Sequence, residues 1–449
     1  MELSRVSMRR IEALVRLLER IRSETEQPAE FLLEFRTLYR ELPREEKPAF
    51  FELLISRMEI RKGDIEKDLR LLVEANDKES DQWIRLLSEL RRKLESPRTA
   101  VFLRFLNMSG GLKFLLDLRA DILVAQHQVS ANLQFLDQDI AHLFNSWFQG
   151  GFLFLQEITQ DSAYRQIRFL KDHDLVHPTA NLEEMGNRLG GDHRCFALYH
   201  RAMPEEPVVF IEAALTHGIA RSLPEVIGEE NEPQLHKATP DTAIFYSINN
   251  AQNGLAGLGL GTVLVFQVVD ALKKDNPDIT TFATLSPIPG FWKRYLKPIL
   301  EGQDASFVLK REKLVEYFPE KARKGLLNHL KEVTGSEAPN FPAALLSILP
   351  DPKWIEDPLC CGWLKKPLTE VCYFYLAQEK DRQGKPLNSV ANFHMSNGAA
   401  VSLKNVNFAA NRLPRGIEES CGMMVNYVYS KTWLQQIGKT MQSLLPWKV

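Results

Sequence analysis

Cysteine is scarce in this sequence, and no two cysteines have a spacing that favours metal binding. Five cysteines occur in 449 residues, no C-x-x-C motif is present, and Cys360 and Cys361 are adjacent. Adjacent thiols are a poor pair of ligands for one zinc ion. An odd number of cysteines at low density is typical of a reducing compartment. The sequence therefore predicts free thiols and no metal site.

An excess of charge of either sign is also missing, and so is a long hydrophobic run. The formal net charge is -2, so neither nucleic acid nor an anionic membrane is predicted as a partner. The longest apolar stretch, residues 255–266, is interrupted by glycines and too short to cross a bilayer. The first residues lack the apolar core of a secretory signal, and the last three are not a peroxisomal signal. We therefore expect a cytoplasmic protein.

The first third of the sequence has apolar residues at the spacing of amphipathic helices. Apolar residues recur at intervals of three and four between Arg and Glu residues, for example at Met8, Ile11, Leu14, Val15 and Leu18. Similar patterns continue to about residue 148, separated by prolines and by a pair of glycines. No repeat of fixed length is visible, which favours a helical bundle over a solenoid.

The pattern changes near residue 150, where short apolar runs begin to alternate with helical patterns. The runs predicted to be strands cover residues 152–158, 195–200, 208–215, 243–248, 282–285, 390–394 and 423–429. The helical patterns cover residues 262–274, 311–318, 321–333 and 341–348. This mixture predicts an α/β domain. The predicted fold is therefore an all-helical bundle domain (1–147) followed by an α/β domain (148–449).

A glycine-rich segment lies between a predicted strand and a predicted helix. Four glycines fall within residues 254–261, and the helix follows at Thr262. Glycines let the backbone approach a phosphate closely, and the N–H groups at a helix start face an anion. The segment has neither the lysine of a P-loop nor the G-x-G-x-x-G spacing of a dinucleotide fold. It resembles the acyl-CoA pyrophosphate loop of the GNAT acyltransferases, although a glycine-rich turn that only packs a helix on a sheet fits the pattern equally well.

Two side chains suited to proton transfer lie in separate segments. Ser286 precedes Pro287, which restricts the serine to an extended backbone and holds its hydroxyl for hydrogen bonding; it is not in a G-x-S-x-G nucleophile elbow. His394 ends an apolar run, and histidine is the side chain best suited to proton transfer near neutral pH. Taken alone, a turn serine and a structural histidine are the more frequent explanations. Asn426 and Tyr427 could line a pocket or belong to an ordinary strand.

Together these segments resemble the malonyl-CoA decarboxylase family. The matching runs keep their order and approximate spacing along the chain, and they cover residues 110–121, 242–248, 258–262, 285–291, 390–394 and 420–427. Such a series is far more specific than any single motif. The first hundred residues match only in helical character.

The resemblance implies a helical domain that mediates oligomerisation, followed by a GNAT-like catalytic domain. Family members are typically homotetramers, built as dimers of dimers. The family's catalytic serine and histidine fall on Ser286 and His394. Its acyl-CoA segment falls on Ala256, Gly257, Leu258, Gly259, Leu260, Gly261 and Thr262. The segment is richer in glycine than in animal members, and the targeting signals of animal members are missing, which suggests a bacterial-type cytosolic enzyme.

The reaction that the resemblance implies converts malonyl-CoA to acetyl-CoA and CO2 through a thioester enolate. The thioester accepts the electrons of the broken bond, so we expect no cofactor. His394 is expected to donate the proton to carbon, and Ser286 to contact the substrate carboxylate and act as proton acceptor. Asn392, Asn426 and Tyr427 are expected to orient the acyl group. Two alternatives stay open: an acyltransferase that passes the acyl group to an amine, and a non-catalytic CoA-sensing protein.

Overall fold

The computed structural model describes residues 4–430, except 24–28, 61, 75–80, 127, 129–132, 228–238 and 336, together with residue 432. The chain divides into two compact units that do not follow chain order. The first unit comprises Met1–Phe154, Leu198–Val209 and Asn250–Leu260. The second comprises Leu155–Ala197, Phe210–Asn249 and Gly261–Val449. The first unit therefore takes in two short segments from the later part of the chain.

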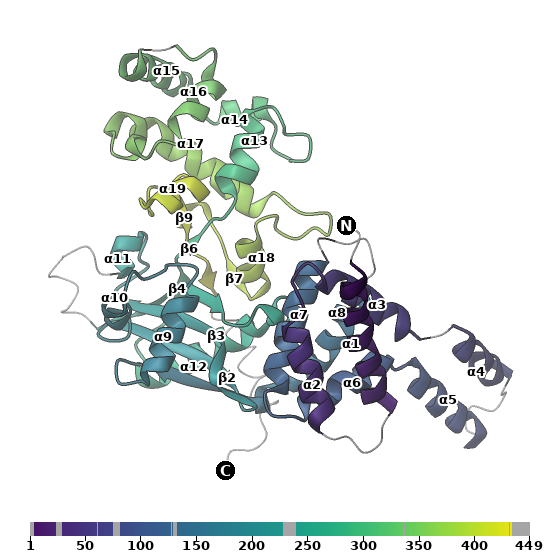
Figure 1. Cartoon of the computed structure of the whole chain (residues 1–449). Helices are drawn as coiled ribbons and strands as arrows, with labels where there is room; N and C mark the ends of the chain where they lie inside the picture. The colour runs from purple at the N-terminus through teal and green to yellow at the C-terminus, as the bar shows by residue number, and fades with distance from the viewer. Residues whose placement is uncertain are drawn as a thin grey trace. The chain divides into compact units, whose positions relative to one another are not determined.

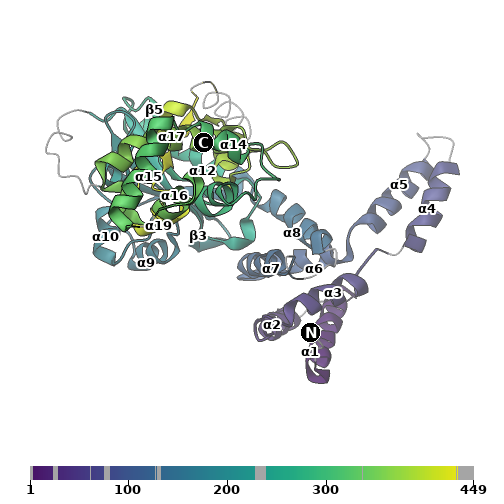
Figure 2. The same cartoon turned by 90° about the horizontal axis from the view of Figure 1, so that it is seen from above.

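The first unit is mainly helical, as predicted. Its helices are α1 (Arg5–Ser23), α2 (Ala29–Arg40), α3 (Lys47–Arg57), α4 (Lys62–Glu74), α5 (Asp81–Leu94), α6 (Pro97–Leu106), α7 (Gly111–Ala125) and α8 (Leu133–Trp147). Helices α4 and α5 lie side by side as a pair, which both views show (Figures 1 and 2). The short helix η3 (Asn253–Leu255) packs on α7.

Buried aromatic rings form the core of this helical unit. Phe35 of α2 contacts Phe50 of α3, Phe105 of α6 and Phe114 of α7, with ring centroids 5.4 to 6.1 Å apart. Truncating one such ring to alanine typically costs about 3–5 kcal/mol. Helices α2, α3, α6 and α7 thus direct apolar faces, which the sequence periodicity indicated, into one shared aromatic core.

A seven-stranded mixed sheet organises the later part of the chain (Figure 1). Its strands, in spatial order, are β1 (Leu153–Ile158), β2 (His193–His200), β3 (Met203–Thr216), β4 (Thr242–Asn250), β5 (Thr281–Thr284), β10 (Val428–Tyr429) and β7 (Ala399–Ala400). Strands β4 and β5 are parallel, and β10 is antiparallel to both of its neighbours. A second, three-stranded sheet has the order β6 (Ser286–Pro287), β9 (Met424–Val425) and β8 (Val406–Asn407).

Helices complete the second unit. They are α9 (Tyr164–His173), α10 (Leu182–Asn187), α11 (Leu223–Ile227), α12 (Leu260–Asp275), α13 (Lys297–Leu300), α14 (Arg311–Glu316), α15 (Glu320–Thr334), α16 (Phe341–Ile348), α17 (Pro358–Ala377), α18 (Ser389–Ser396) and α19 (Pro414–Ser420). Helices α15, α16 and α17 pack together in the upper part of Figure 1. The predicted order, a helical region followed by a mixed α/β region, is confirmed.

One predicted strand is wrong, and it carries the candidate histidine. Residues 390–394 lie in helix α18, not in a strand. The Asn388 side chain caps this helix, because its Oδ1 accepts a hydrogen bond of 2.9 Å from the Ala391 N–H. A short apolar run does not distinguish a strand from a buried helix. The predicted strand at 423–429 is also divided, since Asn426 and Tyr427 separate β9 from β10.

Candidate active site

Ser286 and His394 are 108 residues apart in sequence and lie in contact in the second unit. The Ser286 Oγ is 3.2 Å from the His394 Nε2. Strand β6 holds the serine, whose backbone pairs with Val425 of β9, and helix α18 supplies the histidine. Both side chains are almost fully buried, with relative exposures of 5% and 4%. The structure therefore brings together the two residues that the family resemblance identified.

A chain of hydrogen bonds fixes the orientation of both side chains. The Ser286 hydroxyl donates to the Thr284 Oγ1 at 2.9 Å, and the Tyr429 hydroxyl lies 3.1 Å from the His394 Nδ1. If the serine proton points to Thr284, the His394 Nε2 carries a proton and donates a hydrogen bond to the serine oxygen. The Nδ1 then accepts a hydrogen bond from Tyr429. This arrangement presents a neutral imidazole with its N–H directed at Ser286.

The surroundings of His394 disfavour its charged form. Burial lowers the pKa of His394 to about 3. The ring of Tyr427 stacks on the imidazole, with centroids 4.7 Å apart and an angle of 23° between the planes. The Phe393 ring meets it edge-on. His394 is therefore neutral at physiological pH, and it can take part in chemistry as an N–H donor or as a neutral base.

The three other predicted acyl-binding residues have different environments. Tyr427 is fully buried, and within the described residues its hydroxyl has no hydrogen-bond partner. The Asn426 amide is fully engaged, because it donates to the Ala220 and Thr284 carbonyls and accepts from Asn407.

Asn392 is separated from His394 by the helical geometry of α18. Its Oδ1 accepts a hydrogen bond from the exposed Ser396, at 3.2 Å. In a strand, Asn392 and His394 would share one face, but in a helix two residues apart they point in nearly opposite directions. The structure therefore brings Tyr427 to His394 and does not bring Asn392 there.

The glycine-rich segment begins in the first unit, where helix α7 supports it. The buried Arg119 of α7 donates hydrogen bonds to the carbonyl oxygens of Gly254 and Ala256, at 2.5 and 3.0 Å. Its Nε is 2.7 Å from the Asp137 carboxylate of α8. A Cβ at Gly254 would overlap the backbone of Leu116, so only glycine fits this close approach. One buried guanidinium therefore holds the start of the segment.

The next two glycines serve a different purpose. Gly257 and Gly259 have φ values of 81° and 70°, and a Cβ at either would meet nothing within 4 Å. Their backbone lies in the left-handed region, and the space around them is open. Leu258 lies between them, and Leu260 is the first residue of α12. An open backbone before a helix start is the arrangement that a phosphate-binding loop requires.

The end of the segment packs on the helix that carries His394, within the second unit. The Thr262 hydroxyl donates a hydrogen bond to the side chain of Asn397, the residue whose backbone N–H caps the end of α18. A Cβ at Gly261 would overlap the ring of Phe393. The start of α12 and helix α18 are therefore in direct contact.

Three residues that the sequence analysis did not identify support the site. Thr284 is two residues before Ser286 in an extended segment, so the alternation of side chains was a usable signal for it. Tyr429 lies two residues after Tyr427 and gave no separate signal. Arg119 lies in a helical run that also contains Lys113, Asp117 and Asp121, so its type and position did not single it out.

One group of described side chains has an arrangement suited to a metal ion: His329, Asp357 and Cys360. It includes neither Ser286 nor His394. Among the described helices, none is both long and apolar enough to cross a membrane.

Comparison with known proteins identifies the class to which this fold and site belong. A sequence model of the malonyl-CoA decarboxylase C-terminal domain matches residues 151–442, and one of the N-terminal domain matches residues 62–148. The mitochondrial malonyl-CoA decarboxylase of Anser anser anser is 35% identical over 80% of this chain and 69% of its own length. The Rattus norvegicus protein of the same name is 33% identical over 79% and 69%.

Solved structures agree with the sequence comparison. The crystal structure of malonyl-CoA decarboxylase from Rhodopseudomonas palustris has a TM-score of 0.77 and 27% identity, and the match covers 96% of both chains. That from Agrobacterium vitis has the same TM-score and 28% identity, over 96% of this chain and 95% of the other. The chain is thus an enzyme of the carboxy-lyase class. It belongs to the malonyl-CoA decarboxylase family.

Proposed function

We propose that this protein converts malonyl-CoA to acetyl-CoA and CO2, with Ser286 and His394 as the catalytic residues. The observation that carries the proposal is the buried contact of 3.2 Å between the two side chains, in a chain of this family. Both residues lie in segments on which the family resemblance rests. A buried, hydrogen-bonded serine and histidine provide one hydroxyl and one imidazole that water does not compete for.

The reaction needs a place for two electrons and a source of one proton. When the bond to the carboxylate breaks, its electrons pass to the thioester carbonyl and form an enolate. The enolate is a strong base, so the neutral N–H of His394 is acidic enough to protonate its carbon. The neutral state follows from the burial that lowers the pKa of His394 to about 3. A positioned proton donor contributes roughly 10²–10⁴ in rate.

Ser286 is proposed to contact the carboxylate that leaves as CO2. Its hydroxyl donates a hydrogen bond to the carboxylate. After the His394 Nε2 has given its proton to carbon, the Ser286 hydroxyl passes its own proton to the Nε2 over 3.2 Å, and Ser286 then accepts a proton from water to restore its hydroxyl. Tyr427, stacked on the imidazole with a buried hydroxyl, is proposed to orient the acyl group. Asn426 is proposed to act indirectly, because its amide donates to the Thr284 carbonyl oxygen. Asn392 is proposed to contribute least to orienting the acyl group, because its Oδ1 accepts a hydrogen bond from Ser396.

The CoA part of the substrate is proposed to bind to the segment from Ala256 to Thr262. Two observations support this: the open, left-handed backbone at Gly257 and Gly259, and the start of the long helix α12. Backbone N–H groups at a helix start have no acceptor within the helix, and they attract phosphate oxygens. No cofactor is expected to take part.

The decisive experiment follows acetyl-CoA and CO2 after malonyl-CoA is added to the purified protein. We compare wild type with Ser286→Ala, His394→Asn and a control, Ser396→Ala. The control changes an exposed serine on α18, the helix that carries His394. We expect rapid release by wild type and by the control, unaffected by a chelator, and rates roughly 10²–10⁴ lower in the two site variants. CoA binding must persist in both variants.

Two outcomes would contradict this proposal. A folded, CoA-binding wild type that releases no CO2 would exclude decarboxylation, and transfer of an acetyl group from acetyl-CoA to an amine would then indicate an acyltransferase. Binding of CoA without any turnover would indicate a sensing protein.

We also propose that the protein is a homotetramer of two dimers that works in the cytoplasm. Helices α4 and α5 carry exposed apolar side chains that suit contact with a second copy: Leu69, Leu71, Val73, Ile84, Leu87 and Leu94. Light scattering on wild type and on Val73→Asp tests the assembly. A mass of one chain in wild type would contradict it.

A further inference from the structure

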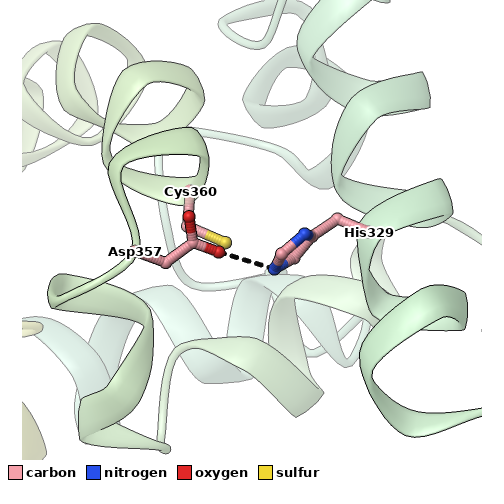
Figure 3. Close-up of side chains that lie close together, drawn as sticks. All are labelled: His329, Asp357 and Cys360. Atoms are coloured by element: carbon pink, nitrogen blue, oxygen red, sulfur yellow. Dashed lines mark ion pairs between the residues drawn. The ribbon is translucent and has the colours of Figure 1, made fainter.

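Three side chains outside the proposed active site converge between two helices of the second unit. His329 belongs to α15, Asp357 directly precedes α17, and Cys360 lies in the first turn of α17 (Figure 3). The His329 Nε2 is 2.6 Å from the Asp357 Oδ2. One nitrogen, one oxygen and one sulfur atom of the three residues all lie within 4.8 Å of one another.

The start of α17 positions Asp357 and Cys360, and a separate helix, α15, positions His329. The Asp357 Oδ1 accepts the Leu359 N–H at 2.8 Å and so caps α17, which leaves the Oδ2 directed at His329. Cys360 is 2% exposed, whereas the side chains of His329 and Asp357 are 20% and 25% exposed. The Trp363 ring fills the space against Gly325 and lies edge-on to His329. The group therefore has one dry side and one side open to water.

We propose that His329, Asp357 and Cys360 bind a divalent cation of the zinc class, with water as the fourth ligand. Imidazole, carboxylate and thiolate are the ligands of zinc in proteins, and together they disfavour magnesium and calcium, which prefer oxygen alone. One carboxylate and one thiolate neutralise a charge of two. The cation would join α15 to α17.

Binding requires a defined movement of protons. Zinc binds the thiolate form of cysteine, and a bound dication favours loss of the thiol proton. The thiol proton is released to solvent as the metal–sulfur bond forms, and the imidazole proton moves to Nδ1 so that Nε2 can coordinate. The metal-free hydrogen-bonded group and the metal-bound group are thus two states of the same residues.

Cys361 provides a matched control because it is adjacent but points elsewhere. Its Sγ lies 3.1 Å from the Ile355 carbonyl oxygen and 3.7 Å from that of Trp354. It is also the more exposed of the two thiols. Any nonspecific metal capture by a surface thiol would therefore depend on Cys361 and not on Cys360.

The experiment titrates the full-length protein with Co²⁺, whose visible absorption reports tetrahedral coordination and whose charge-transfer band reports a thiolate ligand. We expect saturation near one Co²⁺ per chain in wild type and in Cys361→Ser, and displacement by Zn²⁺. Cys360→Ser should lose the thiolate band, and His329→Gln should bind at least about 100-fold more weakly. Zn²⁺ should raise the Tm of wild type and Cys361→Ser but not that of His329→Gln.

Three results would overturn the proposal: no saturable Co²⁺ absorption in wild type, a thiolate band that persists in Cys360→Ser, or one that disappears in Cys361→Ser. None of these measurements uses malonyl-CoA. The site can therefore fail while the decarboxylase proposal stands, and the reverse also holds.

Discussion

The Ser286–His394 pair and the glycine-rich segment are built in opposite ways. At the pair, side chains from distant segments meet in a buried environment and hold each other by hydrogen bonds. In the segment, four of the residues 254–261 are glycines, and Arg119 of a separate helix holds the backbone carbonyls of Gly254 and Ala256. The first arrangement suits proton transfer, and the second suits binding of phosphates by main-chain groups. A substitution should therefore affect turnover in one region and affinity in the other.

Outside the Ser286–His394 pair, the largest effect is expected from Arg119→Met. The change leaves Asp137 without its partner and two carbonyls without donors, which should cost about 3–5 kcal/mol of stability. With the carbonyls of Gly254 and Ala256 released, the KM for malonyl-CoA and the Kd for CoA should rise roughly tenfold or more, while kcat changes little. Steady-state kinetics and CoA titration measure this.

Arg98→Met is the matched control for that variant. Arg98 is also buried in the helical unit and pairs with an aspartate of α8, Asp139, at 2.6 Å. Its guanidinium also donates to the Met58 carbonyl, which is far from the glycine-rich segment in sequence. We expect a similar loss of stability with an unchanged KM. Equal KM values in both variants would show that Arg119 is only structural.

Gly261→Ala should have the next largest effect, because it acts on both regions together. The new methyl group overlaps the Phe393 ring, so α18 must shift, at a cost of about 1–3 kcal/mol. We expect kcat to fall with KM rising. Gly257→Ala, at an open position with φ of 81°, should raise KM and leave kcat unchanged. Identical kinetic changes in the two variants would contradict the division between turnover and affinity.

A pH-dependent effect should distinguish the buried histidine. The folded pKa of His394 is about 3, below the unfolded value of about 6.5. Its contribution to stability is thus present above pH 6.5 and is lost as the pH falls toward 3. His394→Asn cannot bind that proton. Between pH 7 and pH 5 its free energy of unfolding should therefore fall by about 2 kcal/mol less than that of wild type, and its Tm should fall less as well. Parallel curves for wild type and variant would exclude the neutral histidine.

The smallest effect is expected from Tyr429→Phe. The change removes the hydrogen bond to the His394 Nδ1 and keeps the ring, at a cost of about 1 kcal/mol. Without this partner the imidazole can place its proton on either nitrogen, so kcat should fall several-fold and KM should not change. Pre-steady-state turnover measures this. A fall in CoA affinity instead would assign Tyr429 to binding.

The sequence predicted which two side chains meet better than it predicted the secondary structure that carries them. Ser286 lies in the extended backbone that Pro287 indicated, and its partner is the histidine that the family resemblance implied. The helical conformation of residues 389–396 was not predictable from a short apolar run, because its cap and its packing decide it. In the predicted strand Asn392 would share a face with His394, and in the helix it does not.

The glycine-rich segment shows a second limit of sequence analysis. Its glycines were interpreted as one motif, yet Gly254 and Gly261 are required by close packing, and Gly257 and Gly259 by their backbone conformation. These reasons depend on contacts with Leu116 and Phe393, which lie more than 130 positions away in sequence. A local pattern shows where glycine occurs but not which neighbour demands it.

Arg119 lies before the boundary between the two sequence domains, and the loop that it holds lies after that boundary. The family models divide the chain between residues 148 and 151, but the loop Asn250–Leu260 belongs to the same compact unit as α7. A fragment that starts at residue 151 would keep Ser286 and His394 and lose the guanidinium that holds the loop. If that loop binds CoA, as we propose, substitutions in α7 should change substrate affinity, although α7 lies far from Ser286 and His394 in sequence.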